Sequence, residues 1–258
     1  IYIGLANLFS VLIIFFYGLY GLLIRAILLA FVEFGLLYSN KPFSLSFRYK
    51  IEYIKRLFET GLPIFFVGMV NLLWITIVKG SIFKLGGPLN YGLYALSIII
   101  ENVFGVIPNS FAKVIYPKMA IMLGKGIPIP RIIKFSIKPL VNQFFIMLAL
   151  AIIGVYMLPI IVPIILPDYS EGILAAQWML FFPLTQSFSS LNSIYNVLKK
   201  QKWYMISLLS GVLMGSLYMF LCIYIYGFSL EIFPQGLILG SFIQQSLSLF
   251  FIYKLFLK

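Results

Sequence analysis

Residues 91–126 read YGLYALSIIIENVFGVIPNSFAKVIYPKMAIMLGKG, and this stretch decides the fold class. Its first part, residues 91–116, is apolar over more than the roughly 20 residues that a helix needs to cross a bilayer. Glu101 lies well inside it. Ionisable side chains at that depth are costly, so they usually face a cavity or a partner. We therefore expect a helix over 91–116 that lines a pathway, with neighbouring helices as its walls.

Working outward, the composition indicates an integral membrane protein. Of the 258 residues, 62% are hydrophobic and only 10% are charged, whereas soluble domains have about 45–50% apolar and about 25% charged residues. The apolar runs are long and do not alternate with polar residues, which favours helices over a β-barrel. The chain begins at Ile1 inside an apolar run without an initiator Met, so we expect that the N-terminal part of a longer protein precedes it.

Motifs for covalent chemistry are missing from the sequence. It has no His and a single Cys, Cys222, and it contains no HExxH, CxxC, P-loop or GxSxG pattern. We therefore expect neither an enzyme nor a bound metal or cofactor. The net charge of +12 lies in short segments between apolar runs, which indicates membrane topology and not a nucleic-acid partner.

Long apolar stretches predict an all-α, polytopic transmembrane bundle of about eight spans, separated in part by turns at residues 17–21 and 86–88. The spans expected are 1–17, 22–38, 62–82, 91–116, 139–161, 173–198, 203–226 and 234–256. One bent helix over 1–38 is the alternative, but at 1.5 Å per residue it would be about 57 Å long, too long for a single span.

Basic residues alternate with these spans. Residues 39–60 and 117–138 form two predicted basic loops, the first with a short amphipathic helix, and Lys199, Lys200 and Lys202 lie in the next alternate turn. The turns between them carry mainly acids. By the positive-inside rule, the basic loops and the C-terminus are cytoplasmic.

A polar stripe follows Glu101 on the central helix. Asn102 and Asn109 are seven residues apart, so they lie within about 20° of each other around the helix, and Lys113 continues that face. Pro108 removes a backbone hydrogen bond between them and favours a kink. The stripe suits the wall of a moving cavity. Alternatively, the amides link helices and Lys113 extends to the membrane interface.

Arg25 is the candidate cation of the second span. An always-charged guanidinium suits phosphate recognition, so Arg25 either binds an anionic headgroup or pairs with Glu101. The alternative is an interfacial arginine. Lys79 and Lys84 depart from the charge pattern on the outer side, and we expect them to extend outward to the interface.

Two further stripes of hydroxyl and amide side chains recur at helical spacing. They are Thr185, Ser189, Asn192 and Asn196 on the sixth span, and Ser241, Gln244, Gln245 and Ser248 on the eighth. Such groups suit sugar hydroxyls, but they also serve as ordinary hydrogen bonds between membrane helices.

Several local patterns, in order along the chain, resemble those of the polysaccharide flippases of the multidrug/oligosaccharidyl-lipid/polysaccharide exporter superfamily. They are Gly61-Leu62-Pro63-Ile64-Phe65, Gly92-Leu93-Tyr94, Val114 to Ala120 followed by Gly124-Lys125-Gly126, Leu166-Pro167-Asp168-Tyr169, Lys199-Lys200-Gln201-Lys202, and Gly227 with Gly236 and Gly240. The resemblance departs at Ile77-Val78-Lys79, where the family often has an Asp-Arg pair.

The resemblance implies that residues 1–38 are the last two helices of a first lobe, 39–60 a basic cytoplasmic loop, and 61–258 a complete six-helix second lobe. It further implies a flippase that moves polyprenyl-diphosphate-linked oligosaccharide across the cytoplasmic membrane by alternating access. Its partners would be the bilayer, the lipid-linked glycan and other membrane proteins of polysaccharide assembly.

The residues expected to line its cavity are Arg25, Glu101, Asn102, Asn109, Lys113, Asn192, Asn196 and Gln244. A multidrug or cation antiporter of the same superfamily and a non-transporting membrane scaffold subunit are the alternatives.

Overall fold

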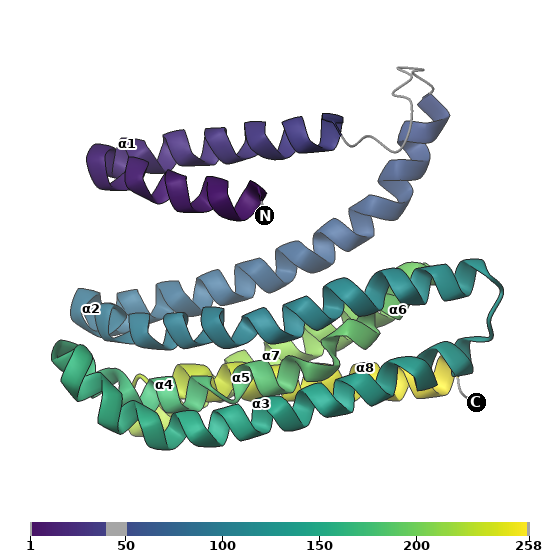
Figure 1. Cartoon of the computed structure of the whole chain (residues 1–258). Helices are drawn as coiled ribbons and strands as arrows, with labels where there is room; N and C mark the ends of the chain where they lie inside the picture. Colours follow the sequence, from purple (N-terminus) through teal and green to yellow (C-terminus); the bar gives the residue numbers. More distant parts are fainter. Residues whose placement is uncertain (1, 40–50, 257–258) are drawn as a thin grey trace. The chain divides into compact units, whose positions relative to one another are not determined.

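The computed structural model describes residues 2–39 and 51–256, which are helical apart from short connections and contain no strand (Figure 1). The expected all-α class is therefore confirmed. The chain divides into two compact units, Ile1–Glu52 and Tyr53–Lys258. Four of the described helices are long and apolar enough to cross a membrane: α2, α3, α7 and α8.

The first unit contains α1 (Tyr2–Ser39), which a kink at Gly18 divides into two arms. Gly18 has φ 53°, in the left-handed region that glycine adopts without steric cost. The predicted turn at residues 17–21 is confirmed by this kink. Because of this kink, residues 2–38 do not form one continuous helix.

Helix α2 (Ile51–Gly124) is a hairpin of two antiparallel arms that meet at Gly87, whose φ is 76° (Figure 1). We name residues 51–86 the first arm and 88–124 the second arm. The predicted turn at 86–88 is confirmed. The short helix predicted within the segment 39–60 is confirmed over residues 51–60, although it continues into the first arm without a break at Gly61. Residues 40–50 lie outside the described part of the chain.

The predicted loop over 117–138 is also wrong, because only residues 125–128 separate α2 from α3 (Ile129–Ile165). Pro117 lies inside the second arm without ending it. The reason is packing: Met119, one turn after Ile115, is almost fully buried in a cluster with Ile132 and Ile133 of α3. Burial of that face extends both helices beyond their membrane-spanning lengths.

The predicted continuous span over 173–198 is wrong as well. This segment is divided into α4 (Ile173–Met179), α5 (Phe182–Thr185), the 3₁₀ helix η2 (Gln186–Asn192) and α6 (Ser193–Val197), and another 3₁₀ helix, η1 (Pro167–Gly172), precedes it. Pro183 removes one backbone donor at the start of α5. The Thr185 hydroxyl bonds the Phe182 carbonyl at 2.7 Å, which competes with regular helix hydrogen bonding.

Helices α7 (Gln201–Tyr226) and α8 (Ile232–Phe256) pack backbone against backbone through two GxxxG motifs. A Cβ atom added to Gly211 would lie 2.4 Å from the Gly240 carbonyl oxygen, and one added to Gly215 would lie 2.6 Å from that of Gly236. Small residues at four-residue spacing are what allow membrane helices to approach this closely.

Trp74 joins the first arm of α2 to this pair. Its ring lies against Gly215 and Gly240, where their added Cβ atoms would meet it at 2.9 and 2.7 Å. Its indole Nε1 donates to the Ser216 hydroxyl at 3.2 Å. Trp74 is 4% exposed and belongs to the larger of two apolar clusters, which also contains Tyr94 and Phe233.

Candidate functional site

A polar cavity of about 270 Å³ lies among the two arms of α2 and the broken segment α5–η2. The second arm supplies Glu101, Asn102, Gly105, Pro108 and Asn109; the first arm supplies Asn71 and Ile75; and the broken segment supplies Phe182, Pro183, Gln186 and Ser189. The structure thus brings three of the predicted residues, Glu101, Asn102 and Asn109, to one cavity.

Helical spacing explains why these side chains converge. Asn71, Ile75 and Lys79 follow one another at four-residue steps along the first arm, so they form one ridge. Glu101, Gly105 and Asn109 form the facing ridge on the second arm. Because the hairpin at Gly87 makes the arms antiparallel, the two ridges lie opposite each other.

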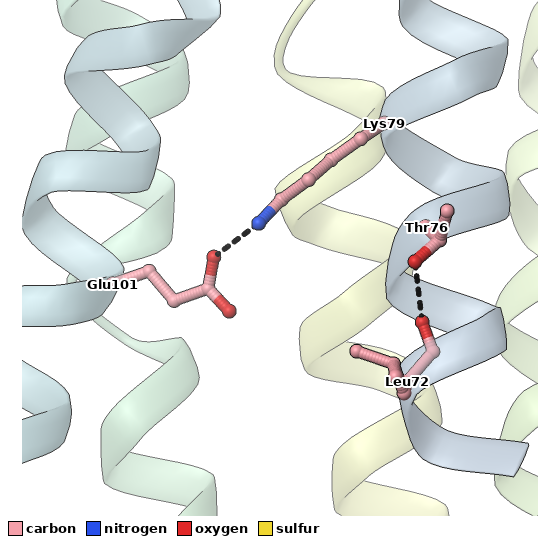
Figure 2. A network of polar contacts seen from close by, with 4 residues as sticks. All are labelled: Leu72, Thr76, Lys79 and Glu101. Atoms are coloured by element: carbon pink, nitrogen blue, oxygen red, sulfur yellow. Dashed lines mark hydrogen bonds and ion pairs between the residues drawn. The ribbon is translucent and has the colours of Figure 1, made fainter. Parts of the chain in front are cut away.

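Lys79 and Glu101 form an ion pair across the hairpin. The Lys79 Nζ atom lies 3.4 Å from Glu101 Oε2, and the two side chains are 27% and 16% exposed. Figure 2 shows Lys79 extending from one arm toward the carboxylate on the other, while Thr76 bonds the Leu72 carbonyl of its own helix. The expectation that Lys79 extends outward is therefore wrong, because the facing carboxylate offers it a partner.

The two charged groups of this ion pair are not within hydrogen-bonding distance of ideal length. Its 3.4 Å separation exceeds the 2.7–2.9 Å of a charge-assisted hydrogen bond. Buried Oε2 accepts no hydrogen bond from the described residues. Glu101 therefore lines the cavity with an acceptor that is only partly satisfied by the protein itself.

A second polar cluster joins the broken segment to α8, away from the cavity lining. Asn192 Nδ2 donates to Gln245 Oε1 at 3.1 Å, and the Ser248 hydroxyl donates to Asn192 Oδ1. The Tyr195 hydroxyl donates to the Ser248 carbonyl at 2.7 Å. Here the two predicted stripes meet, and both amide atoms of Asn192 are used in contacts between helices.

The other predicted residues lie in varied surroundings. Gln244 Nε2 donates to the Tyr204 hydroxyl at 3.2 Å, so it links α7 and α8. Asn196 is half-buried on α6, and Lys113 is exposed on the second arm, outside the cavity lining. Arg25 is half-buried on α1 in the first unit, and its proposed pairing with Glu101 stays a prediction.

Sequence reasoning missed Asn71 and Gln186 and misassigned Lys79. Asn71 is an isolated amide in an apolar run, and its four-residue register with Lys79 was the available signal. Gln186 lies beside the predicted stripe that begins at Thr185, and the helix breaks at this point. Its Nε2 donates to the Ser241 hydroxyl at 2.7 Å, which fixes the cavity wall to α8.

Among the described residues, no group of three His, Cys, Asp or Glu side chains could hold a metal ion. Comparison with known proteins finds no family model that matches the sequence, and no match among curated proteins or solved structures. The function is therefore argued from the cavity and its walls.

Replacing Asn192 by alanine is expected to lower the free energy of unfolding by about 1–3 kcal/mol, because it removes the hydrogen bonds of Asn192 with Gln245 and Ser248, which are both buried on α8. Asn142→Ala, at an exposed amide on α3, is the matched control and should change little. Thermal unfolding of the purified variants in detergent measures both. Equal melting temperatures for the two variants would contradict the structural role of Asn192.

Proposed function

We propose that this protein is a membrane transporter in which the Glu101 cavity is part of the solute pathway, and that it flips a polyprenyl-diphosphate-linked oligosaccharide. The observation that carries the proposal is the coincidence of this polar cavity with the broken segment over residues 173–197. Irregular backbone at membrane depth is tolerated where it is buried in protein or lines a cavity, and broken helices form the substrate sites of many transporters.

The chemistry of the lining supports a hydroxyl-rich substrate. Asn71, Asn102, Asn109, Gln186 and Ser189 offer both donors and acceptors without net charge. The Lys79–Glu101 pair supplies charged groups of both signs beside them. The cavity is small for a ligand pocket, so an oligosaccharide passes only if the walls move, as they do in alternating access.

The resemblance of the sequence motifs to the polysaccharide flippases supports the choice of substrate and the arrangement. In this proposal the chain crosses the cytoplasmic membrane about eight times, with the basic turns and the C-terminus inside, and residues 61–258 form one lobe of the transporter. Arg25 attracts the diphosphate. The polyprenyl tail stays in the lipid.

The two alternatives are less well supported. A drug or cation antiporter needs acids in its cavity to hold cations, but the lining residues of this cavity include a single acid, Glu101, and a lysine, Lys79, lies 3.4 Å from it. A scaffold subunit has no need for polar groups around a cavity and should tolerate their loss.

The test is complementation of a prokaryotic strain that lacks its glycan flippase. The full-length protein should restore surface polysaccharide and clear the accumulated lipid-linked intermediate. Asn109→Leu, in the cavity lining, should reduce surface glycan at least about tenfold, a loss of more than about 1.4 kcal/mol. Arg25→Ala should abolish export at normal protein levels.

Asn142→Leu is the matched control, since Asn142 is also an exposed amide but lies on α3 outside the cavity. It should export normally. Full export by both the Asn109 and the Arg25 variants would exclude the flippase pathway proposed here and favour the scaffold. Drug resistance conferred without restored glycan would favour the antiporter.

A further inference from the structure

A second hollow, of about 620 Å³, lies between the second arm of α2 and the first half of α3, and shares no lining residue with the Glu101 cavity. Its wall is mostly apolar and includes Phe111, Val114 and Phe135. Three lysines, Lys118, Lys134 and Lys138, complete the lining. We name it the lysine groove. Its volume falls in the range of pockets that bind small molecules, about 300–1,000 Å³.

Helical register places the two kinds of side chain together. Val114 and Lys118 are one turn apart on α2, and Lys134 and Lys138 are one turn apart on α3, with Phe135 beside them. The three lysines are exposed. Within the described ranges, no carboxylate forms an ion pair with any of them. The groove therefore gathers three positive charges that no described carboxylate neutralises.

The apolar wall is open as well. Val114 is 55% exposed and Phe135 is 45% exposed, so the described residues do not fill this wall, and in a membrane-spanning chain it is available to lipid. The lysines belong to the basic segment around the α2–α3 turn, which the charge pattern assigns to the cytoplasmic side. A ligand that matches the groove thus needs an anionic head at that interface and an apolar tail toward the membrane.

We propose that the lysine groove binds an anionic phospholipid of the cytoplasmic leaflet. The phosphate of the headgroup lies between the lysine ammonium groups, and an acyl chain covers Phe111, Val114 and Phe135. Basic pockets between membrane helices on the cytoplasmic side are suited to such headgroups. The inference rests on the contacts of α2 and α3 and does not depend on the proposed transport function.

The test is native mass spectrometry of the purified protein in detergent with added phosphatidylglycerol. We expect one tightly bound lipid per chain. Phosphatidylcholine with the same acyl chains should bind at least about tenfold more weakly. The Lys118→Gln/Lys134→Gln/Lys138→Gln variant should bind phosphatidylglycerol about a hundredfold more weakly, since each lysine near an anionic headgroup contributes roughly fivefold.

The matched control is Lys125→Gln/Arg131→Gln/Lys254→Gln. It removes three exposed basic side chains from the same end of the second unit, where the α2–α3 turn and the end of α8 lie, but none of them lines the groove (Figure 1). It should bind phosphatidylglycerol within about twofold of the unchanged protein. Equal losses in the two triple variants would overturn the proposal, because they would indicate general charge attraction.

A further variant, Val114→Trp, keeps every charge and fills the groove. It should weaken lipid binding at least about tenfold while circular dichroism and gel filtration stay unchanged. Glycerol 3-phosphate at the same concentration should fail to displace the lipid. Displacement by this water-soluble headgroup, or full binding by the tryptophan variant, would exclude the acyl-chain contact and with it the phospholipid.

Discussion

Replacing Gly240 by valine is expected to lower the melting temperature of the purified protein by roughly 6–12 °C, the largest stability change that we predict. A Cβ atom at this position would lie 2.6 Å from the Gly211 carbonyl oxygen and 2.7 Å from the Trp74 ring. Neither neighbour can yield easily, because one is helix backbone and the other is a buried aromatic ring. Overpacking of this kind costs about 3 kcal/mol, and each kcal/mol shifts the melting temperature by about 2–4 °C in a protein of this size.

Gly68→Val is the matched control for this experiment. Gly68 is also helical, on the first arm of α2, and an added Cβ there meets no atom of the structure within 4 Å. The melting temperature of the Gly68→Val variant should stay within about 2 °C of that of the unchanged protein, because surface substitutions usually cost less than about 0.5 kcal/mol. If both valines lowered the melting temperature equally, the close approach of α7 and α8 would not be the cause.

Replacing Lys79 by methionine is expected to destabilise the protein by about 2 kcal/mol and to reduce glycan export at least about tenfold. The change leaves the Glu101 carboxylate, 16% exposed, without its partner. Removing one partner of a fully buried pair costs about 3–5 kcal/mol, and an exposed pair contributes about 0–1 kcal/mol. The partial burial of this pair places the expected cost between those limits.

A double-mutant cycle separates stability from transport. The Lys79→Met/Glu101→Gln variant should recover most of the lost stability, because neither charge is left unpaired. It should still fail to export glycan if the Glu101 carboxylate takes part in the transport cycle. Recovery of both properties would assign the pair a purely structural role.

Lys84→Met provides the control for the loss of a positive charge. Lys84 lies near Lys79 on the same arm but is exposed and, among the described residues, forms no ion pair. Its removal should change neither the melting temperature nor export. A loss of stability equal to that of Lys79→Met would point to positive charge near the Gly87 end of the hairpin, and not to the contact with Glu101.

The sequence predicted the features that depend on local pattern. Long apolar runs predicted the helices, and Gly18 and Gly87 lie at the predicted turns because glycine alone adopts their left-handed backbone without strain. The helical spacing of Asn102 and Asn109 was sufficient to place them on one face, and both line the Glu101 cavity. All of these arguments concern residues that are near one another in the chain.

Features set by tertiary contacts were not predictable in this way. The second arm continues past Pro117 because Met119 is buried against α3, a contact between distant residues. The break over 173–197 depends on hydrogen bonds to Ser241 and Gln245 of α8, which satisfy side chains where the helix is irregular. Lys79 turns toward Glu101 because the hairpin brings a carboxylate within reach. Each outcome required knowledge of the facing helix.

The glycine contacts between α7 and α8 limit how these two helices can move against each other. With carbonyl groups at the positions that side chains normally occupy, rotating or sliding either helix by a residue would force a Leu, Val or Met into the backbone of the other. The two helices are therefore expected to move as one rigid unit. The Trp74 ring packs against this unit and connects the first arm of α2 to it. In the proposed transport cycle, the helical hairpin at Gly87 and the broken segment are then the candidate sites of movement, since these two elements border the polar cavity or join its walls.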